Sequence, residues 1–198
     1  MNLFDQWKST KNFSDRPVEI EVLEDIFEDT TKAPTAFNLQ PYSFKVIEEK
    51  DFDKVENTLV SGNEWVLDAK KIVLLVGDER MDTNLQQALE DMLERGLIDQ
   101  KEAEQYRDRI SGYRGRTDEF KHKWLTRNTM IPATFFMLSS INHGLGCCPV
   151  KGFSSEKVSE GLNLEEWERP QLMIPIGYPE EESERTWRRD SEELYEFI

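Results

Sequence analysis

Residues 33–42 read Ala-Pro-Thr-Ala-Phe-Asn-Leu-Gln-Pro-Tyr and separate two segments of different periodicity. Before them, apolar residues recur every three or four positions over residues 19–32, which predicts an amphipathic helix. After them, residues 43–48 alternate between polar and apolar side chains, which predicts a strand. Pro34 cannot continue a helix, and Asn38 and Gln40 offer uncharged donors and acceptors. The stretch is therefore either an ordinary helix-to-strand loop or a surface for a flat, polar, heteroaromatic ligand.

The rest of the chain predicts helices around a sheet. Residues 71–76 are a lysine followed by five consecutive apolar residues, which is typical of a strand that is covered on both faces. Residues 82–110 predict two helices joined at residues 95–97, residues 111–118 a loop, and residues 119–143 a helical segment with Pro132 inside it. Residues 171–178 predict another strand. We expect one domain over residues 1–198, of class α+β, with a central mixed sheet between two helical layers.

Composition narrows the function. The chain has 198 residues and a net charge of −15, which argues against binding nucleic acid or an anionic membrane surface. It has no apolar run long enough to span a membrane and no signal-peptide pattern at its N-terminus. The two cysteines, Cys147 and Cys148, are adjacent, which predicts small buried residues in a reducing compartment, the cytoplasm, rather than a disulfide.

Motifs for catalysis by side chains alone are missing from the sequence. Gly144-Leu-Gly146 follows a predicted helix rather than a strand, so it does not fit a dinucleotide-binding turn. The two histidines, His122 and His143, are 21 positions apart and lie in no metal-binding pattern. No nucleophile elbow or phosphate-binding P-loop occurs. If the chain is an enzyme, a bound cofactor is expected to carry the chemistry.

The segment Lys8-Ser-Thr-Lys11 places two ammonium groups and a hydroxyl close together, either as a solvated helix end or as a phosphate site. This segment, followed by Pro17-Val18, a helix and residues 33–42, resembles the FMN-dependent nitroreductase family. Residues 65–69 before the buried strand, residues 136–152 with their Pro-x-x-Gly turn, residues 174–179 and the basic tail 185–193 continue the resemblance in the same order.

The resemblance implies a homodimer with FMN at the subunit interface. The residues implied to bind FMN from one subunit are Lys8, Ser9, Lys11, Asn63, Pro149, Val150, Lys151 and Gly152, with Arg188 or Arg189 of the tail closing the phosphate site. Those implied from the other subunit are Pro34, Thr35 and Ala36, with Asn38 supporting their loop. The Gly152 N–H is expected to point at flavin N5, and Asn63 to lie near the flavin O2 and N3 edge. The tail is expected to wrap the partner subunit.

The implied activity is an oxidoreductase with ping-pong kinetics. NADH or NADPH would give hydride to flavin N5, and a nitroaromatic, a quinone or a similar acceptor would take two electrons. Two alternatives stay open: the same FMN fold with another reaction (dehalogenation, heterocycle dehydrogenation or flavin breakdown), and a flavin-binding protein without turnover. Over residues 100–123, Tyr106, Tyr113 and Phe120 are candidates either to stack over the flavin or simply to pack.

Overall fold

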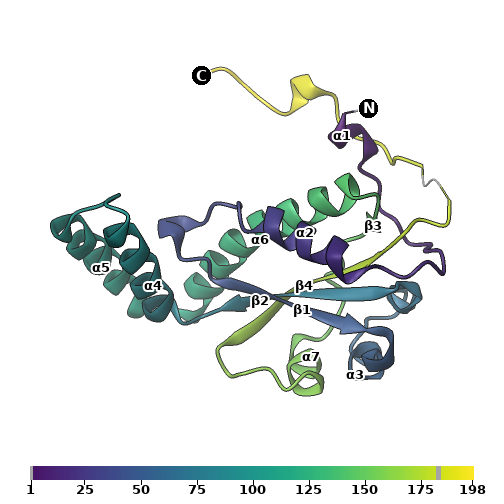
Figure 1. Cartoon of the computed structure of the whole chain (residues 1–198), viewed down its shortest axis with the longest axis horizontal. Coiled ribbons are helices and arrows are strands. Elements are labelled where there is room, and N and C mark those ends of the chain that lie inside the picture. The colour runs from purple at the N-terminus through teal and green to yellow at the C-terminus, as the bar shows by residue number, and fades with distance from the viewer. Residues whose placement is uncertain (1, 182–183) are drawn as a thin grey trace.

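The computed structural model describes residues 2–181 and 184–198, and its centre is one sheet (Figure 1). Within the described residues the sheet has four strands in the order β1-β2-β4-β3. Their bounds are Tyr42–Glu48 for β1, Lys71–Asp78 for β2, Gly146–Cys147 for β3 and Glu168–Gly177 for β4. All three strand pairs are antiparallel, and a register shift interrupts the β2–β4 pair between Leu75 and Val76.

The predicted α+β class is confirmed, while the mixed character of the sheet needs a correction. Among the described residues, the only parallel pairing is an isolated bridge between Ser9 and Cys147. The four strands themselves are antiparallel. Parallel strands were expected because predicted helices and strands alternate along the chain. Here the connections return each strand beside an antiparallel neighbour instead.

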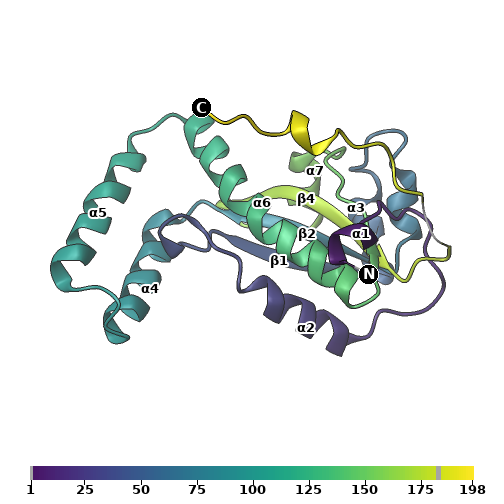
Figure 2. The ribbon, with the colours of Figure 1, turned by 90° about the horizontal axis from the view of Figure 1, so that it is seen from above.

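Helices cover both faces of the sheet, as predicted (Figures 1 and 2). On one face lie α2 (Ile20–Thr30) and α6 (Asp118–Asn142), and on the other α3 (Asp53–Glu56) and α7 (Ser155–Gly161). Strand β2 serves both cores, because successive side chains of a strand point to opposite faces. Val73 and Leu75 pack towards α2 and α6, whereas Ile72 and Leu74 pack towards α3 and α7.

Helix α6 runs without a break through Pro132, which is buried. The sequence left open whether a new helix starts there or a long helix kinks, and one continuous helix of 25 residues is the outcome. Its second half presents Ala133 and Phe136 to the sheet. Leu125 in its first half packs directly on the backbone of Gly77 in β2. In the described part of the chain, no helix is both long and apolar enough to cross a membrane.

Helices α4 (Met81–Glu94) and α5 (Gln100–Arg114) project from one end of the sheet (Figures 1 and 2). Gly96 ends the first of them with φ 65°, as its place in the sequence predicted. The loop predicted over residues 111–118 is shorter, because α5 continues to Arg114. Both helices share a separate apolar cluster with residues 37–39, whose buried members are Leu39, Leu85, Leu89, Ala103 and Ile110.

The remaining elements are short. They are α1 (Leu3–Gln6) and the 3-10 turns η1 (Ala36–Asn38), η2 (Glu49–Asp51), η3 (Glu64–Asp68) and η4 (Ser191–Glu193). The described part of the tail leaves large apolar side chains in solvent, with Trp187 79% and Phe197 92% exposed. Figure 1 shows this tail extending above the helices, away from the sheet.

Candidate functional site

The N-terminal basic segment lies beside β3. The Thr10 N–H donates to the Cys147 carbonyl at 3.1 Å, next to the bridge between Ser9 and Cys147. A Cβ at Gly146 would overlap the side chain of Thr10, so a glycine is needed for this close approach. The structure therefore brings Lys8, Ser9 and Lys11 to the strand that leads into the turn 149–152.

A hydrogen bond between Asn63 and Gly152 fixes the turn 149–152 next to this segment. The Asn63 amide Nδ2 donates to the Gly152 carbonyl at 3.2 Å, and the Val60 N–H donates to the same oxygen at 2.9 Å. A Cβ on Gly152 would overlap Asn63 Nδ2. Within the described residues the Gly152 N–H has no hydrogen-bond partner, whereas the Val150 N–H donates to the Met173 carbonyl at 2.7 Å. The turn thus presents a backbone donor that the described protein does not use.

Charged and polar side chains surround the same turn. The Lys151 ammonium donates to the Gln171 carbonyl at 2.8 Å, and partial burial lowers the pKa of Lys151. Burial raises the pKa of the Cys148 thiol, although a hydrogen bond with Ser9 and the positive charge of Lys11 act in the opposite direction. Cys148 is therefore a protonated, buried thiol that lies against the basic segment.

Residues 33–40 lie at the other end of the sheet. They precede Tyr42, which pairs with Gly77, whereas the basic segment adjoins Cys147, which faces Ile176 opposite Lys71. The six residue steps along β2 between Gly77 and Lys71 span about 20 Å. The structure therefore does not bring Pro34, Thr35, Ala36 and Asn38 together with Lys11 of the same chain, whereas Val150 in the turn 149–152 pairs with Met173, opposite Leu74 in the middle of β2.

A set of contacts fixes this distant loop. The Ala36 N–H donates to Asn128 Oδ1 at 2.8 Å, and the Gln40 N–H donates to Thr35 Oγ1 at 2.9 Å. Phe37, Asn38 and Gln40 all have positive φ angles, of 55°, 52° and 44°. For residues other than glycine such angles cost energy, so the surrounding contacts must hold the loop in place.

The tail arginines are not placed near either group. Arg188 donates to the Thr186 hydroxyl at 2.6 Å and to the Trp187 carbonyl at 2.9 Å, both within the tail itself. Arg188 and Arg189 are exposed. In the part of the chain that the structure describes, no hydrogen bond or ion pair joins Arg188 or Arg189 to Ser9 or Lys11.

Three residues that sequence reasoning did not assign to the site contact it. Trp65 faces Lys11, Cys148 adjoins Ser9, and Asn128 holds Ala36. Trp65 had a signal, because it follows Asn63 in a predicted helical turn. Asn128 had none, since it lies 92 residues from its partner.

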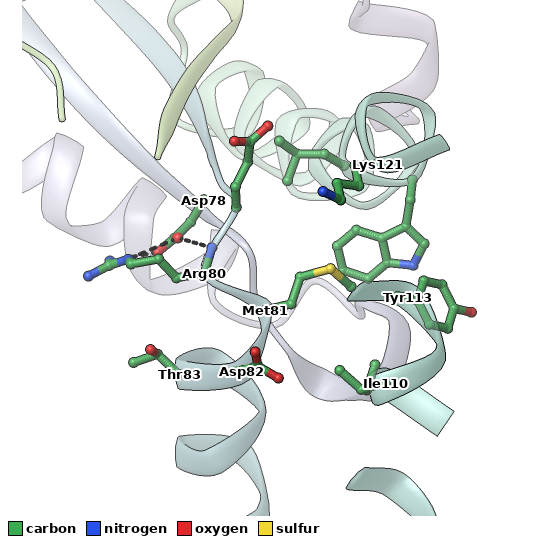
Figure 3. A pocket seen from close by; sticks show the side chains of 11 residues that line it. Asp78, Arg80, Met81, Asp82, Thr83, Ile110, Tyr113 and Lys121 are labelled. Carbon is green, nitrogen blue, oxygen red and sulfur yellow. Dashed lines mark hydrogen bonds and ion pairs between the residues drawn. The ribbon is translucent and has the colours of Figure 1, made fainter. Parts of the chain in front are cut away.

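The aromatic candidates within residues 100–123 pack against other aromatic side chains. Tyr106 meets Phe37 edge-on with ring centres 5.8 Å apart, and Tyr113 lies 5.4 Å from Phe120. Figure 3 shows Tyr113 beside a cavity of about 440 Å³ at the α4 end of β2. Its wall also includes Met81, Ile110 and Lys121, together with the ion pair between Asp78 and Arg80 at 2.7 Å. None of the residues predicted to bind a cofactor lines this cavity.

Comparisons with known proteins agree with the fold. MhqN of Bacillus subtilis (strain 168), named as a candidate NAD(P)H nitroreductase, is 29% identical over 201 residues, covering 100% of this chain and 98% of MhqN. The crystal structure of ydfN from Bacillus subtilis, a candidate nitroreductase, matches with a TM-score of 0.88 at 26% identity, over 99% of this chain and 97% of that one.

A further solved structure, of a candidate nitroreductase from Exiguobacterium sibiricum 255-15 in complex with FMN, has a TM-score of 0.87. It is 19% identical and covers 99% of this chain and 95% of its own, so it supports the fold alone. The sequence model of the nitroreductase family matches residues 5–178 of this chain. Because that match spans nearly the whole chain, this protein belongs to the nitroreductase family.

Proposed function

We propose that this chain is an FMN-dependent NAD(P)H oxidoreductase, a single domain that works as a homodimer with FMN at the subunit interface. One observation carries the proposal. The basic segment 8–11 and the loop 34–38, both expected around a single flavin, adjoin opposite ends of β2, about 20 Å apart along the strand. A second copy of the chain would supply the loop 34–38 to the group around Lys11 and Gly152, and so complete one site from two chains.

The basic segment would bind the phosphate. Lys8 and Lys11 concentrate positive charge in a chain with a net charge of −15, and Ser9 adds a hydroxyl. Arg188 or Arg189 of the tail would close this site, because an exposed tail can dock on a neighbouring subunit. The exposed side chains of Trp187 and Phe197 give that tail an apolar reason to dock.

The turn 149–152 would meet the flavin ring. The Gly152 N–H is available for flavin N5, and Asn63 fixes the turn through its bond to the Gly152 carbonyl. Pro149 and Val150 would line the ring, and Lys151 would contribute mainly backbone, because its ammonium bonds to Gln171. These residues fit a flavin. The Gly152 N–H is a backbone donor without a described partner, and the Lys11 cation would stabilise negative charge on the reduced ring.

The chemistry that bound FMN would supply is two-electron transfer, taking hydride from NADH or NADPH at N5 and reducing a nitroaromatic, a quinone or a similar acceptor. The chain orients the ring and supplies the cation, while Pro34, Thr35 and Ala36 of the partner subunit cover it, with Asn38 supporting their loop. Ile131 and Phe135, partly exposed on α6, would join the subunit interface. Two free cysteines favour a reducing cytoplasm.

An absorbance spectrum of the purified protein tests this function. We expect a yellow protein whose flavin absorbance bleaches when NADH or NADPH is added without oxygen, and returns when a quinone follows. Lys11→Met should weaken FMN binding, whereas Lys123→Met, which removes an exposed lysine paired with Glu119 on α6, should leave it unchanged. A colourless protein that takes up no added FMN would refute the proposal. Bound FMN that NAD(P)H cannot reduce would favour a flavin-binding protein without turnover.

A further inference from the structure

The ammonium of Lys11 lies 5.0 Å from the ring centre of Trp65. This distance is within the range of about 6 Å over which a cation is attracted to an aromatic face. No described carboxylate forms an ion pair with Lys11, although the chain has 40 acidic residues. By contrast, Lys70 pairs with Asp15 at 3.1 Å.

Trp65 is itself firmly placed. It belongs to η3, where the neighbouring Val66 is fully buried and donates its N–H to the Asn63 carbonyl at 3.0 Å. Asn63 in turn bonds to Gly152. One short turn therefore carries both the residue that faces the Lys11 ammonium and the residue that locks the turn 149–152.

An aromatic ring differs from a carboxylate as the neighbour of a lysine. A carboxylate would hold the ammonium but would also cancel its charge. The face of an indole attracts the ammonium and leaves its net charge uncompensated. A lysine side chain has four rotatable bonds and loses conformational entropy when it is fixed. A ring that restrains the side chain before the anion arrives therefore strengthens anion binding.

We propose that Trp65 is a positioning residue that holds the Lys11 ammonium at the flavin site without neutralising it. This inference rests on the proposed function, because it takes FMN as the anion that Lys11 meets. The contact itself is a property of the chain without ligand, so it can be tested separately.

The test compares FMN affinity, by fluorescence titration of flavin-free protein, in four variants. Trp65→Met keeps an apolar side chain and removes the ring, and should weaken FMN binding roughly three- to tenfold. Trp65→Phe keeps an aromatic face and should stay within about twofold of wild type. The double variant Trp65→Met with Lys11→Met should bind no more weakly than Lys11→Met alone, because the ring acts through the lysine.

The matched control is Trp167→Met. The guanidinium of Arg80 lies 4.8 Å from the ring centre of Trp167, at the other end of the sheet. The Trp167→Met variant therefore loses the same kind of contact and should keep its FMN affinity. The reduction potential of bound FMN is a second readout, and Trp65→Met should lower it in the same direction as Lys11→Met. A purely structural role of Trp65 would not produce this agreement.

If Trp65→Met does not fold, fluorinated tryptophan keeps the ring shape and weakens its negative face. FMN affinity should then fall in the wild-type chain and not in Lys11→Met. Equal losses in Trp65→Met and Trp65→Phe, or fully additive losses with Lys11→Met, would overturn the inference while leaving the function intact. Wild-type protein that binds no FMN would overturn both. A double-mutant cycle on thermal unfolding of flavin-free protein then shows whether the contact exists at all.

Discussion

Asn128→Ala offers a way to damage the loop 34–38 without touching a flavin. Asn128 is buried, accepts the Ala36 N–H at 2.8 Å and donates to the Trp124 carbonyl at 2.9 Å. Removing its amide leaves the Ala36 N–H without its partner, at a cost of about 1–3 kcal/mol. If the loop must be ordered to cover the flavin, the same cost weakens FMN binding about 5- to 150-fold.

Mixing subunits then tests whether the site is shared. Lys11→Met damages the other group of the same proposed site. In a heterodimer of Asn128→Ala and Lys11→Met chains, one site receives an intact Lys11 from the first chain and an intact loop from the second. The other site receives both defects. After random reassociation about half of the dimers are mixed, so roughly one quarter of all sites should bind FMN at wild-type affinity.

The assay is FMN binding to the refolded or co-expressed mixture, measured at a flavin concentration too low to fill either parent. A mixture of Asn128→Ala with Thr35→Ala is the matched control, because both chains then carry a damaged loop and no site is restored. A first mixture that binds no more FMN than the average of its parents would refute the shared site. Both groups would then have to act within one chain across about 20 Å.

Three further outcomes follow from single contacts. Gly152→Ala should weaken FMN binding and leave the protein folded, because the new Cβ overlaps Asn63 Nδ2; titration with circular dichroism as a control checks this. Burial alone would raise the pKa of Asp78, but its bonds to Arg80 lower it below the ordinary 3.8, so the ionised form stabilises the fold above that value and less as pH falls through the lowered pKa. Asp78→Asn should accordingly lower the free energy of unfolding at pH 7, with the difference closing below about pH 3.8 in urea titrations. Gln40→Gly should leave the free energy of unfolding unchanged or raise it by up to about 1 kcal/mol, since glycine accepts a positive φ; a loss of that size would show that Gln40 is not strained.

The central part of the fold could be predicted from local pattern. Residues 72–76 are apolar without interruption, and the strand they form is buried on both faces. The change from helical to strand periodicity around residues 33–42 is equally local. The observed α2 and β1 lie close to the bounds predicted on either side of it. The mixed sheet was wrong because strand direction depends on how distant segments pair, which local pattern does not show. Pro132 inside α6 was ambiguous for a related reason: packing against the sheet decides whether such a helix continues.

The candidate site, too, could be predicted from the sequence only in part. The glycine of the turn 149–152 and the basic segment carried signals, and the structure places them together at β3. The contacts that hold them did not, because Asn63 and Gly152 are 89 residues apart. The placement of residues 34–38 away from Lys11 depends on which end of β2 each loop leaves, and no motif records that.

The strained loop gives the strongest physical reason to assign residues 33–40 a role beyond connection. Positive φ angles at Phe37, Asn38 and Gln40 each cost on the order of 1 kcal/mol or more for residues other than glycine. A plain connection between α2 and β1 could use glycine or a relaxed turn and avoid that cost. Instead, Asn128 and Thr35 hold the loop by hydrogen bonds, and Tyr106 packs on Phe37. A backbone held in this shape by two helices and by its own Thr35 is what a surface that must fit a rigid ring on another subunit requires, because a flexible loop would lose conformational entropy at each binding event.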